Sequence, residues 1–564
     1  MLRALRHGFT ASEYERAKAN LLSELEKQYN ERDKVKSQNY CREYVRHFID
    51  NEPIPGIETE YALAQALTQN ISLEVLNQYM KELVGEGNLV VACMLPEKDG
   101  VKYPTKEELI SALNKVAAED IAALEDKSSN EPLIKKMPKA GKVVKNENAQ
   151  FGYKKLSLSN GAVVYYKNTD FKADEIKMHA FSEGGTSLYG DKDVANLKVI
   201  DELIGVGGFG SFSLTELTKA LAGKHVNMTP AINTYSETLD GETTPKDVET
   251  FLQLNYLYFT AQRADNDAFQ SWKSKRAAVL VNAATNPMKY LSDTIRKELY
   301  PNLPRLKSLT LEDLDQVNYK RCQQICKERF SNTADFTFIF TGNIDESTFI
   351  PLVEKYIASL PAKGNKEMHK DFGGAVRDGS RENIFKHEME IPTATVLIAS
   401  HGKVDYNLKN KLAYSIAEQV IDIVLTEEIR EKEGGTYGVS VSAGVNNLPH
   451  PYVMMQIYYQ TDPEKYEYLN KRIEEVIADF AQNGPSETNM AKVKEYMVKK
   501  YQENLRNNGY FSRTMKEYLL NGVDNCTDYE KVLNSITVND VRVAVADLLK
   551  QNNKVKVVMH GIAK

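Results

Sequence analysis

The sequence lacks several features that would assign it to a specialised class of protein. It has no basic excess, because 72 Lys and Arg residues face 78 Asp and Glu residues, which gives a net charge of -6. A chain without surplus positive charge is poorly suited to neutralising phosphates, so we expect no nucleic-acid partner. It has no apolar run long enough to span a bilayer, so we expect no membrane insertion. Residues 1–10 lack the apolar core and the cleavage site of a signal peptide.

Cysteine and clustered histidine are also scarce. Five cysteines in 564 residues are few and odd in number, which makes a disulfide framework improbable. Cys322 and Cys326 are four residues apart in a helical pattern, which favours one helix face over a pair of metal ligands. The nine histidines are dispersed, and no two are closer in sequence than His387 and His401. HExxH and HxxEH motifs are therefore absent, and we predict no metal site in this chain.

Other common catalytic signatures are missing or lie in the wrong context. Gly205, Gly207 and Gly210 fit the pattern G-x-G-x-x-G, but they follow a helix predicted over 196–204. A dinucleotide-binding fingerprint follows a strand, so we interpret these glycines as a turn. Residues 182–186 read as a loop after a strand predicted over 176–181. No serine or cysteine nucleophile with a placed base can be nominated.

What the sequence does contain is a distinctive helix–glycine–strand stretch. From Tyr406 to Glu433, apolar residues recur at steps of three and four, which predicts an amphipathic helix. Gly434 and Gly435 end this helix, and an alternating run from Tyr437 predicts a half-buried strand. Arg430 is then in the last helical turn and Tyr437 at the start of the strand. Two polar groups on rigid elements across a glycine elbow can form a substrate clamp or an oxyanion donor.

The same residues also have an ordinary structural interpretation. The helix dipole alone favours an arginine in a last helical turn. A tyrosine in a strand is equally common, because aromatic residues suit half-buried sheet surfaces. From these residues alone, the structural and the functional interpretation therefore both stand.

A helix followed by a strand closes three parts of the chain at near-equal intervals. These endings begin at Ile71, Leu309 and Ile536 and lead to strands predicted from Asn88, Asp335 and Lys554. A charged helix comes well before each of them, starting near Phe9, Ala264 and Pro485. Three matches in the same order indicate an internal repeat of domain size. The chain then holds two whole repeats and the back half of a third.

This repeat divides the chain into four parts. We expect residues 1–127 to be the second half of a unit and residues 128–150, which are polar and rich in lysine, to be a linker. Residues 151–362 and 363–564 form the two whole units, with a glycine-containing seam over 361–383 between them. Strands, helices and a hairpin from Tyr437 to Tyr459 interleave. This order favours an α+β architecture in which each unit is a mixed, mostly antiparallel sheet covered by helices.

The elbow resembles a known family motif. The sequence I-R-E-K-E-G-G-T-Y-G-V-S from Ile429 is similar to the L-R-E-K-x-G-x-x-Y segment of the pitrilysin/insulinase family of zinc peptidases. The F-S-E-G-G-T loop at Phe181, the opening K-K-L-S-L-S-N-G from Lys154 and the repeat length agree with that family. The resemblance implies repeated pitrilysin-like units, in which two halves close like a clamshell around unfolded peptides. It also implies zinc in the complete protein, bound by an HxxEH motif in the first domain.

The resemblance assigns roles to two residues and removes one. Arg430 would hold a substrate main-chain carbonyl, and Tyr437 would donate to the oxyanion of the tetrahedral intermediate as a catalytic residue. The position of HxxEH reads Asn196-Leu-Lys-Val-Ile200, which can neither bind zinc nor activate water. The resemblance therefore implies the C-terminal, substrate-enclosing part of a zinc metalloendopeptidase. Such a part binds no zinc itself, is inactive alone and works with a missing N-terminal zinc domain.

Two alternatives remain open at this point. The chain could be a non-catalytic subunit that pairs with a separate zinc-bearing chain. It could also be a non-enzymatic module that binds peptides by strand addition to a sheet edge. The sequence does not specify a compartment, although a bacterial parent that had lost its signal peptide would be periplasmic.

Overall fold

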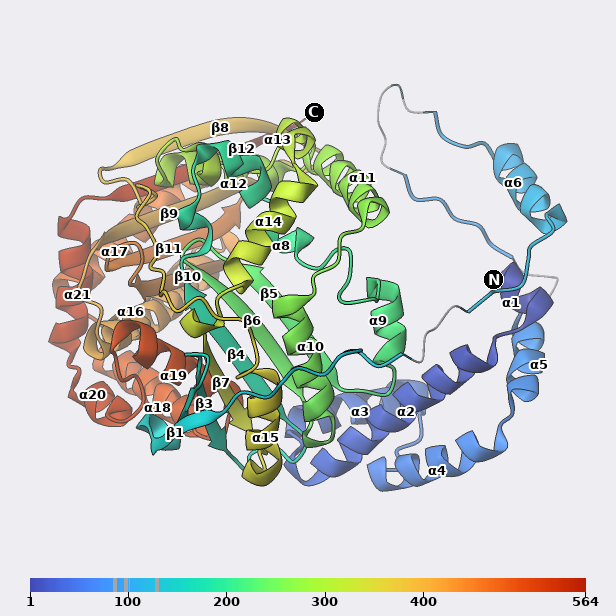
Figure 1. Cartoon of the computed structure of the whole chain (residues 1–564). Helices are drawn as coiled ribbons and strands as arrows, with labels where there is room; N and C mark the ends of the chain where they lie inside the picture. Colours follow the sequence, from blue (N-terminus) through green and yellow to red (C-terminus); the bar gives the residue numbers. More distant parts are fainter. Residues whose placement is uncertain (85–88, 96–99, 101, 127–130, 564) are drawn as a thin grey trace. The chain divides into compact units, whose positions relative to one another are not determined.

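The computed structural model describes residues 1–84, 89–95, 100, 102–126 and 131–563, which form two compact units (Figure 1). Unit 1 comprises Met1–Lys135, Lys172–Asp174 and Ser211–Val226, and unit 2 comprises Lys136–Phe171, Glu175–Gly210 and Asn227–Lys564. The predicted α+β class is confirmed, because two mixed sheets are covered by helices. None of the described helices combines the length and the apolar character that a bilayer crossing requires.

Sheet 1 has the strand order β1-β2-β3-β7-β4-β6-β5. Its strands are β1 (Val143–Asn148), β2 (Lys154–Leu158), β3 (Val163–Asn168), β4 (Ile176–Glu183), β5 (Val226–Ile232), β6 (Ser236–Thr243) and β7 (Thr337–Gly342). The predicted closing strand of the first repeat, β7, lies between parallel β3 and antiparallel β4. It therefore completes the sheet from the middle.

Sheet 2 has the strand order β10-β11-β9-β12-β8. Its strands are β8 (Arg381–Met389), β9 (Ala394–Lys403), β10 (Thr436–Asn446), β11 (Tyr452–Thr461) and β12 (Lys554–Ala563). The closing strand β12 again lies centrally, antiparallel to β9 and parallel to β8. The predicted β10–β11 hairpin is confirmed. The two closing strands thus occupy equivalent places in the two sheets, as an internal repeat requires.

The helices follow the same order in each repeat. Those of residues 1–126 are α1 (Leu2–His7), α2 (Ala11–Glu31), α3 (Ser37–Asp50), α4 (Ile57–Asn70), α5 (Leu73–Leu83) and α6 (Lys106–Ala118). Next come α7 (Val194–Leu197), α8 (Ile200–Leu203), α9 (Leu214–Ala220), α10 (Val248–Thr260), α11 (Asn266–Ala283), α12 (Pro287–Leu299), α13 (Leu311–Gln316), α14 (Tyr319–Phe330) and α15 (Glu346–Tyr356). The last are α16 (Leu408–Leu425), α17 (Tyr466–Asn483), α18 (Glu487–Asn504), α19 (Asn508–Asn521), α20 (Tyr529–Ser535) and α21 (Val538–Lys550).

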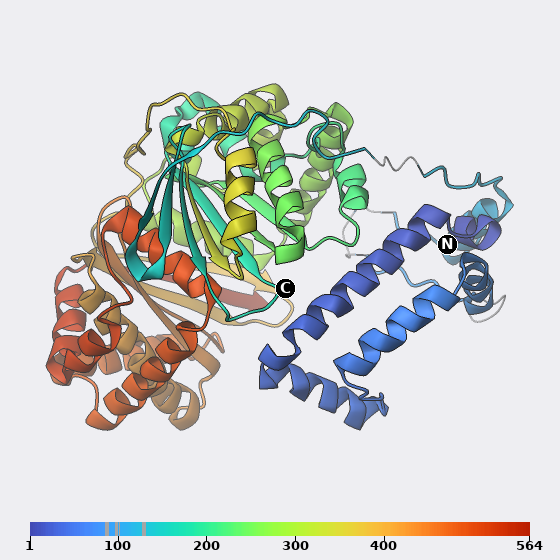
Figure 2. The ribbon, with the colours of Figure 1, turned by 60° about the horizontal axis from the view of Figure 1, so that its bottom comes forward.

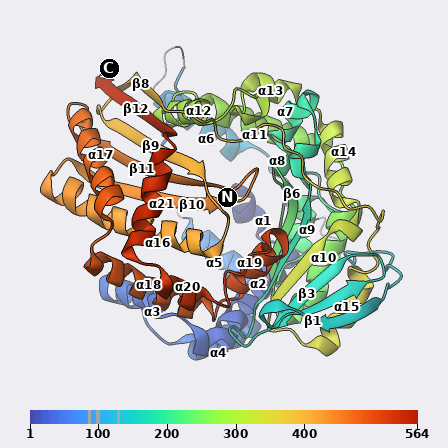
Figure 3. The same ribbon diagram turned by 90° about the vertical axis from the view of Figure 1, so that its left-hand side faces the viewer.

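Each sheet of unit 2 is packed on one face by helices of its own repeat and on the other by a helix of the other repeat. Helices α16, α17 and α21 cover one face of sheet 2, whereas Leu291 and Leu299 of α12 pack on the opposite face. Conversely, Phe511 and Met515 of α19 pack on sheet 1, against a cluster that includes Ile339. Figure 3 shows α12 beside β12 and α19 beside β3. The two repeats therefore exchange one helix each.

Unit 1 is mainly helical. Helix α2 packs along α4, and the rings of Tyr29 and Tyr61 lie 5.4 Å apart, as the long blue helices of Figure 2 show. The predicted capping box at the start of α2 is confirmed, with Thr10 and Glu13 bonding reciprocally. The buried Asp126 carboxylate binds Arg16 at 2.7 Å and Lys219 at 2.8 Å. These hydrogen bonds, that of Lys219 first, hold the pKa of Asp126 well below its usual range.

Two predicted elements differ in the structure. Residues 89–95 form no strand, and Val90 and Met94 are 86% and 97% exposed; Asn88, where the prediction began, lies outside the described residues. A closing strand needs flanking strands, which β3 and β4 supply to β7, and the described residues before 89 contain only helices. The helix predicted over 196–204 is two single turns, α7 and α8, because Val199 has a non-helical ψ of 4°. In addition, part of the segment expected to be a linker forms the edge strand β1.

Candidate functional site

The helix that leads into the elbow is regular until its last turns. Residues 408–425 form α16, whose apolar stripe packs in the core of the second repeat. The following residues, Thr426–Lys432, form a π-helical turn that ends at Glu433. Turns of this kind are uncommon and occur often at functional sites, because they displace side chains from the regular helical pattern. The turn carries Arg430, as predicted, and buries its neighbour Ile429 completely.

The glycine elbow is held tightly on both sides. Gly434 has φ 57°, a left-handed conformation that glycine adopts without strain. A Cβ atom on Gly435 would lie 2.8 Å from the side chain of Leu469, so only glycine fits against α17. The Gly435 carbonyl accepts a hydrogen bond from the buried Thr461 hydroxyl of β11. The elbow is therefore fixed, and the two elements that meet there are held at a defined angle.

Arg430 and Tyr437 are both exposed, and Tyr437 is 101% exposed. Among the described residues, neither side chain makes a hydrogen bond or an ion pair. A guanidinium carries five donors and stays charged at any physiological pH, and a phenol carries one donor. Two donors without internal partners on a fixed frame can both be offered to an external ligand.

The carboxylates nearest to Arg430 in sequence are engaged elsewhere. Glu433 accepts a hydrogen bond from Tyr468 at 2.9 Å and one from Arg472 at 3.3 Å, both on α17. Glu428 pairs with Lys432. The hydrogen bond to Glu433 raises the pKa of the Tyr468 phenol. These contacts tie the π-helical turn to α17 and leave Arg430 outside the network.

The segment at the position of the zinc motif is built into the interior instead. Asn196 is 6% exposed, and Val199 and Ile200 are each 1% exposed. The Asn196 side-chain oxygen accepts the backbone N–H of Asn318 at 2.8 Å and lies 3.5 Å from the Cys322 sulfur. Lys198 binds Asp313 at 2.8 Å. The polar groups of this segment are therefore used to hold α7 against α13 and α14.

These residues do not fit a zinc ion. The single amide oxygen of Asn196 is already bonded, and the residues that replace the remaining motif positions are a lysine and two aliphatic side chains. Burial raises the pKa of the nearby Cys322 thiol to about 12, so this sulfur stays protonated and is a poor ligand. Across the described residues, no group of three or more His, Cys, Asp or Glu side chains could hold a metal ion.

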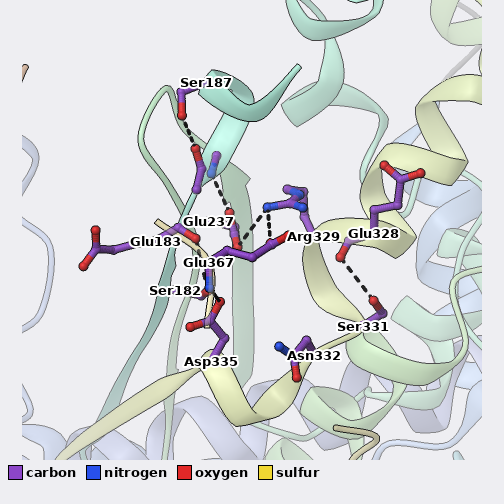
Figure 4. A network of polar contacts seen from close by, with 12 residues as sticks. Ser182, Glu183, Ser187, Glu237, Glu328, Arg329, Ser331, Asn332, Asp335 and Glu367 are labelled. Carbon is purple, nitrogen blue, oxygen red and sulfur yellow. Dashed lines mark hydrogen bonds and ion pairs between the residues drawn. The ribbon is translucent and has the colours of Figure 1, made fainter. Parts of the chain in front are cut away.

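A second polar cluster lies where sheet 1 meets the seam between the repeats (Figure 4). Glu237 of β6 is 1% exposed and accepts the Gly185 N–H at 2.9 Å. Arg329 of α14 lies 3.8 Å from Glu237 and binds Glu367 of the seam at 2.8 Å. Burial raises the pKa of the Glu237 carboxyl to about 8. Because Glu237 is enclosed and bonded within the protein, we interpret this cluster as a structural fastening of the seam.

The structure brings the two predicted site residues to one elbow but does not test their roles. The three glycines of the G-x-G-x-x-G pattern form a turn, and a Cβ atom on Gly207 would lie 2.3 Å from the carbonyl oxygen of Arg263. Their rejection as a cofactor site agrees with the helix that precedes them. Sequence reasoning missed Thr436, whose hydroxyl bonds to the backbone beside Tyr437. A threonine two residues before a glycine in a strand was the available signal, since threonine hydroxyls often bond local backbone groups.

Comparison with known proteins identifies relatives of this chain. Residues 316–497 match the family model described as the peptidase M16 inactive domain. The chain is 22% identical over 524 residues to "Zinc protease PQQL-like" of Arabidopsis thaliana, which covers 90% of this chain and 52% of that protein. It is 20% identical over 561 residues to "Probable zinc protease PqqL" of Escherichia coli, which covers 96% of this chain and 58% of that protein.

A solved structure supports the same relationship at the level of fold. The crystal structure of the periplasmic protease PqqL from Escherichia coli superposes with a TM-score of 0.69 and 18% identity. The match covers 99% of this chain and 62% of that one. The present chain therefore spans little more than half the length of the curated relatives that it matches.

Proposed function

Because this chain belongs to the pitrilysin/insulinase peptidase family, we propose that it forms the C-terminal, substrate-enclosing part of a zinc metalloendopeptidase that hydrolyses unfolded peptides. One observation carries the proposal. Arg430 and Tyr437, which match the family motif, are both exposed and free of internal partners on a tightly held elbow. Side chains held in this way, with their hydrogen-bonding capacity unused, are suited to recognising an external substrate.

The chemistry of the two side chains defines their roles. The Arg430 guanidinium donates hydrogen bonds to a substrate main-chain carbonyl and positions the peptide. The Tyr437 hydroxyl donates to the oxygen that becomes negatively charged as the scissile carbonyl turns tetrahedral. A preorganised donor of this kind contributes about 10²- to 10³-fold to kcat. Both groups act without changing their own protonation state, so they need no neighbouring base.

Zinc would polarise the scissile carbonyl and activate water in the complete enzyme, but the residues of this chain do not fit it. We therefore propose that another pitrilysin-like unit supplies the metal and that this chain is inactive alone. The lengths of the relatives are consistent with such a unit, because 42% to 48% of each lies outside the match. Whether that unit belongs to the same polypeptide or to a separate one, it must dock on this chain.

Helix α3 of unit 1 offers a surface for this docking. Tyr40, Tyr44 and Phe48 are spaced by four residues and form an apolar stripe, and they are 40%, 56% and 89% exposed. Val45 and Ile49 beside them are 53% and 69% exposed. No residue of this helix is buried. Five large apolar side chains exposed on one helix of 14 residues indicate an interaction surface.

The two complete repeats show what such a helix does. Helices α12 and α19 each follow a long charged helix, as α3 follows α2. Their apolar residues have the same spacing: Leu291, Ile295 and Leu299 in α12, and Phe511, Met515 and Leu519 in α19. Both of these helices pack on the sheet of another repeat. By this correspondence, we propose that the stripe of α3 packs on the sheet of a pitrilysin-like unit that is not included in this chain.

A second copy of this chain is a poor candidate for the docking partner. The sheet faces that receive such a helix are already covered by α12 and α19 in the described structure. A different unit with an uncovered sheet is required, which agrees with the need for an external zinc site. Burying a side chain such as Phe48 contributes about 1.5 to 3 kcal/mol, so the stripe can sustain a specific complex.

The docking is tested by charging the stripe. Phe48→Asp should leave the melting temperature of the isolated chain unchanged, because the side chain is 89% exposed. It should weaken binding to the polypeptide that carries the zinc-bearing unit of the parent enzyme by at least tenfold, measured by isothermal titration calorimetry. Ile391→Asp, at an apolar residue that is 80% exposed in unit 2, is the matched control. Equal effects of the two substitutions would exclude α3 as the docking helix.

The function itself is tested with the reconstituted enzyme. Hydrolysis of an unstructured fluorogenic peptide should fall strongly with Tyr437→Phe through kcat and with Arg430→Ala through kcat/KM. The isolated chain should hydrolyse none and should contain near-zero zinc by elemental analysis. Unchanged hydrolysis after both substitutions would show that the roles are wrong.

The alternative functions differ in what they require. A non-catalytic subunit that pairs with a separate zinc-bearing chain needs the same α3 surface, so the two cases differ only in whether one polypeptide or two are involved. A peptide-binding module acting by strand addition needs a free sheet edge. Beside the elbow, the outward N–H of Val441 on edge strand β10 is already bonded to Asp422 at 3.1 Å, which disfavours strand addition there.

We also propose a compartment and a substrate class. The structural relative from Escherichia coli is described as periplasmic, and we propose the same compartment for a bacterial parent of this chain. The substrate is a peptide or an unfolded polypeptide, because only an extended chain exposes its main-chain carbonyls to Arg430 and Tyr437.

A further inference from the structure

The strand that carries Tyr437 contains an irregularity at that residue. Thr436 of β10 is paired with Thr461 of β11, whereas Val439 is paired with Tyr459. Tyr437 and Gly438 therefore lie opposite the single residue Gln460. Two residues facing one define a β-bulge, which bends a strand and re-aims its side chains.

The bulge reverses the direction in which Tyr437 points. Val439 and Val441 are 7% and 8% exposed and face the core, while Ser440 faces out. In an unbroken strand, Tyr437 would share the buried face of Val439, because side chains alternate with a period of two. Our prediction from the alternating pattern put it there, yet Tyr437 is 101% exposed. The additional residue moves the tyrosine to the open side of the sheet.

The hydroxyl of Thr436 holds the bulge together. It donates to the carbonyl of Gln460, the residue opposite the bulge, at 2.6 Å. It accepts the backbone N–H of Gly438, the second bulge residue, at 3.2 Å. One side chain thus joins the partner strand to the irregular backbone, at the point where the regular ladder of hydrogen bonds is interrupted.

We infer that Thr436 is a positioning residue, whose hydroxyl maintains the bulge that presents Tyr437 to the substrate. The inference deepens the proposed function, because the catalytic role of Tyr437 rests on it. The existence of the anchor does not rest on that function. Without the hydroxyl, the end of β10 can return to the regular alternation and turn Tyr437 towards the core.

The anchor is tested first in the isolated chain, which needs no zinc-bearing partner. Thr436→Val keeps the shape of the side chain and removes both hydrogen bonds, whereas Thr436→Ser keeps the hydroxyl. Hydrogen exchange of the Gly438 amide should become about tenfold faster in Thr436→Val and stay within twofold in Thr436→Ser. Nitration of Tyr437 by tetranitromethane, mapped by mass spectrometry, should decrease only in Thr436→Val.

A matched control separates this effect from general disturbance of β10. Ser440→Ala removes an exposed hydroxyl from the same strand and should change neither readout. Thr436→Ala removes the same two bonds with a smaller side chain and serves if Thr436→Val does not fold. Unchanged exchange and nitration in every folded variant that lacks the hydroxyl would overturn the inference.

Kinetics of the reconstituted enzyme distinguish the positioning role from the proposed function. Thr436→Val should lower kcat at least tenfold with KM within threefold, and Thr436→Ser should restore kcat to within twofold. If Tyr437→Phe lowers kcat but Thr436→Val does not, Thr436 has no positioning role. If neither substitution lowers kcat although exchange and nitration change as expected, the anchor stands and the role of Tyr437 is wrong.

Discussion

The segment Asn196–Ile200 and the elbow Ile429–Ser442 use their polar side chains in opposite ways. In the first, Asn196 and Lys198 bond to Asn318 and Asp313. In the second, the hydrogen bonds to side chains hold the backbone, and Arg430 and Tyr437 stay free. A chain that retains a family fold can thus lose a site in one repeat and keep one in the next.

The comparison teaches how a structural region differs from a candidate site. Both regions are rigid, so rigidity alone identifies neither. The difference is that the elbow breaks a local rule, because a bulge places a tyrosine on the exposed face where the alternation would bury it. Departures of this kind, maintained by specific bonds, are expected at functional sites.

The largest expected effect comes from writing two residues of a zinc motif into the buried segment. Val199 and Ile200 are each 1% exposed, so Val199→Glu with Ile200→His buries a carboxyl and an imidazole without partners. We expect a loss of more than about 4 kcal/mol in the free energy of unfolding by urea denaturation. The control pair, Val144→Glu with Ile391→His, lies at positions that are 64% and 80% exposed and should cost little. A stable variant that binds zinc would show that this region is a dormant metal site.

The next effect concerns pH and the buried cluster at the seam. Burial raises the pKa of Glu237 from 4.5 to about 8 in the folded protein, so the folded state keeps a proton that the unfolded state releases. Stability should be highest below about pH 4.5 for this group and fall by about 1.4 kcal/mol per pH unit as the pH rises towards 8. Glu237→Gln should remove this slope in urea denaturation at several pH values. A slope of the same size in the variant would assign it to other groups.

A smaller effect is expected from Asn196→Ala. The substitution leaves the buried N–H of Asn318 without its acceptor, which should lower the free energy of unfolding by about 1 to 3 kcal/mol. Activity of the reconstituted enzyme should not change, because the segment has only a structural role. Asn227→Ala, at an exposed asparagine of β5, is the stability control. Loss of activity without loss of stability would reverse the comparison between the two regions.

The smallest effect is expected at the surface of the elbow. Arg472 binds Glu433 at 3.3 Å, with the two side chains 31% and 25% exposed. Partly exposed ion pairs contribute at most about 1 kcal/mol, so Arg472→Ala should change the melting temperature only slightly. Nitration of Tyr437 should also stay unchanged, because the bulge is held by Thr436. A large decrease in nitration would move the anchor of the elbow from β11 to α17.

The sequence was sufficient for the features that depend on local periodicity. The apolar steps of three and four predicted α16, the two glycines predicted its end, and the following alternation predicted the β10–β11 hairpin. The repeat was also readable, because capping residues and apolar runs recur in the same order at the starts of α13 and α21. These signals lie within one or two elements and need no knowledge of distant partners.

The remaining features depend on contacts between distant residues. The strand predicted from Asn88 is absent over 89–95, because a strand forms only with neighbours to pair with. The exchange of α12 and α19 depends on tertiary packing, since an apolar stripe does not state which sheet it will cover. The bulge at Tyr437 depends on the register with β11, which alternation within β10 cannot reveal.

The central claim is that Tyr437 stabilises the tetrahedral transition state of peptide hydrolysis, and its most direct test is a comparison of affinities. In the reconstituted enzyme, Tyr437→Phe should weaken binding of a phosphinic peptide analogue of the tetrahedral intermediate by the factor that it takes from kcat/KM. The Kd of the corresponding uncleaved peptide should stay within twofold. Equal weakening of the analogue and the peptide, or no weakening of either, would contradict the account.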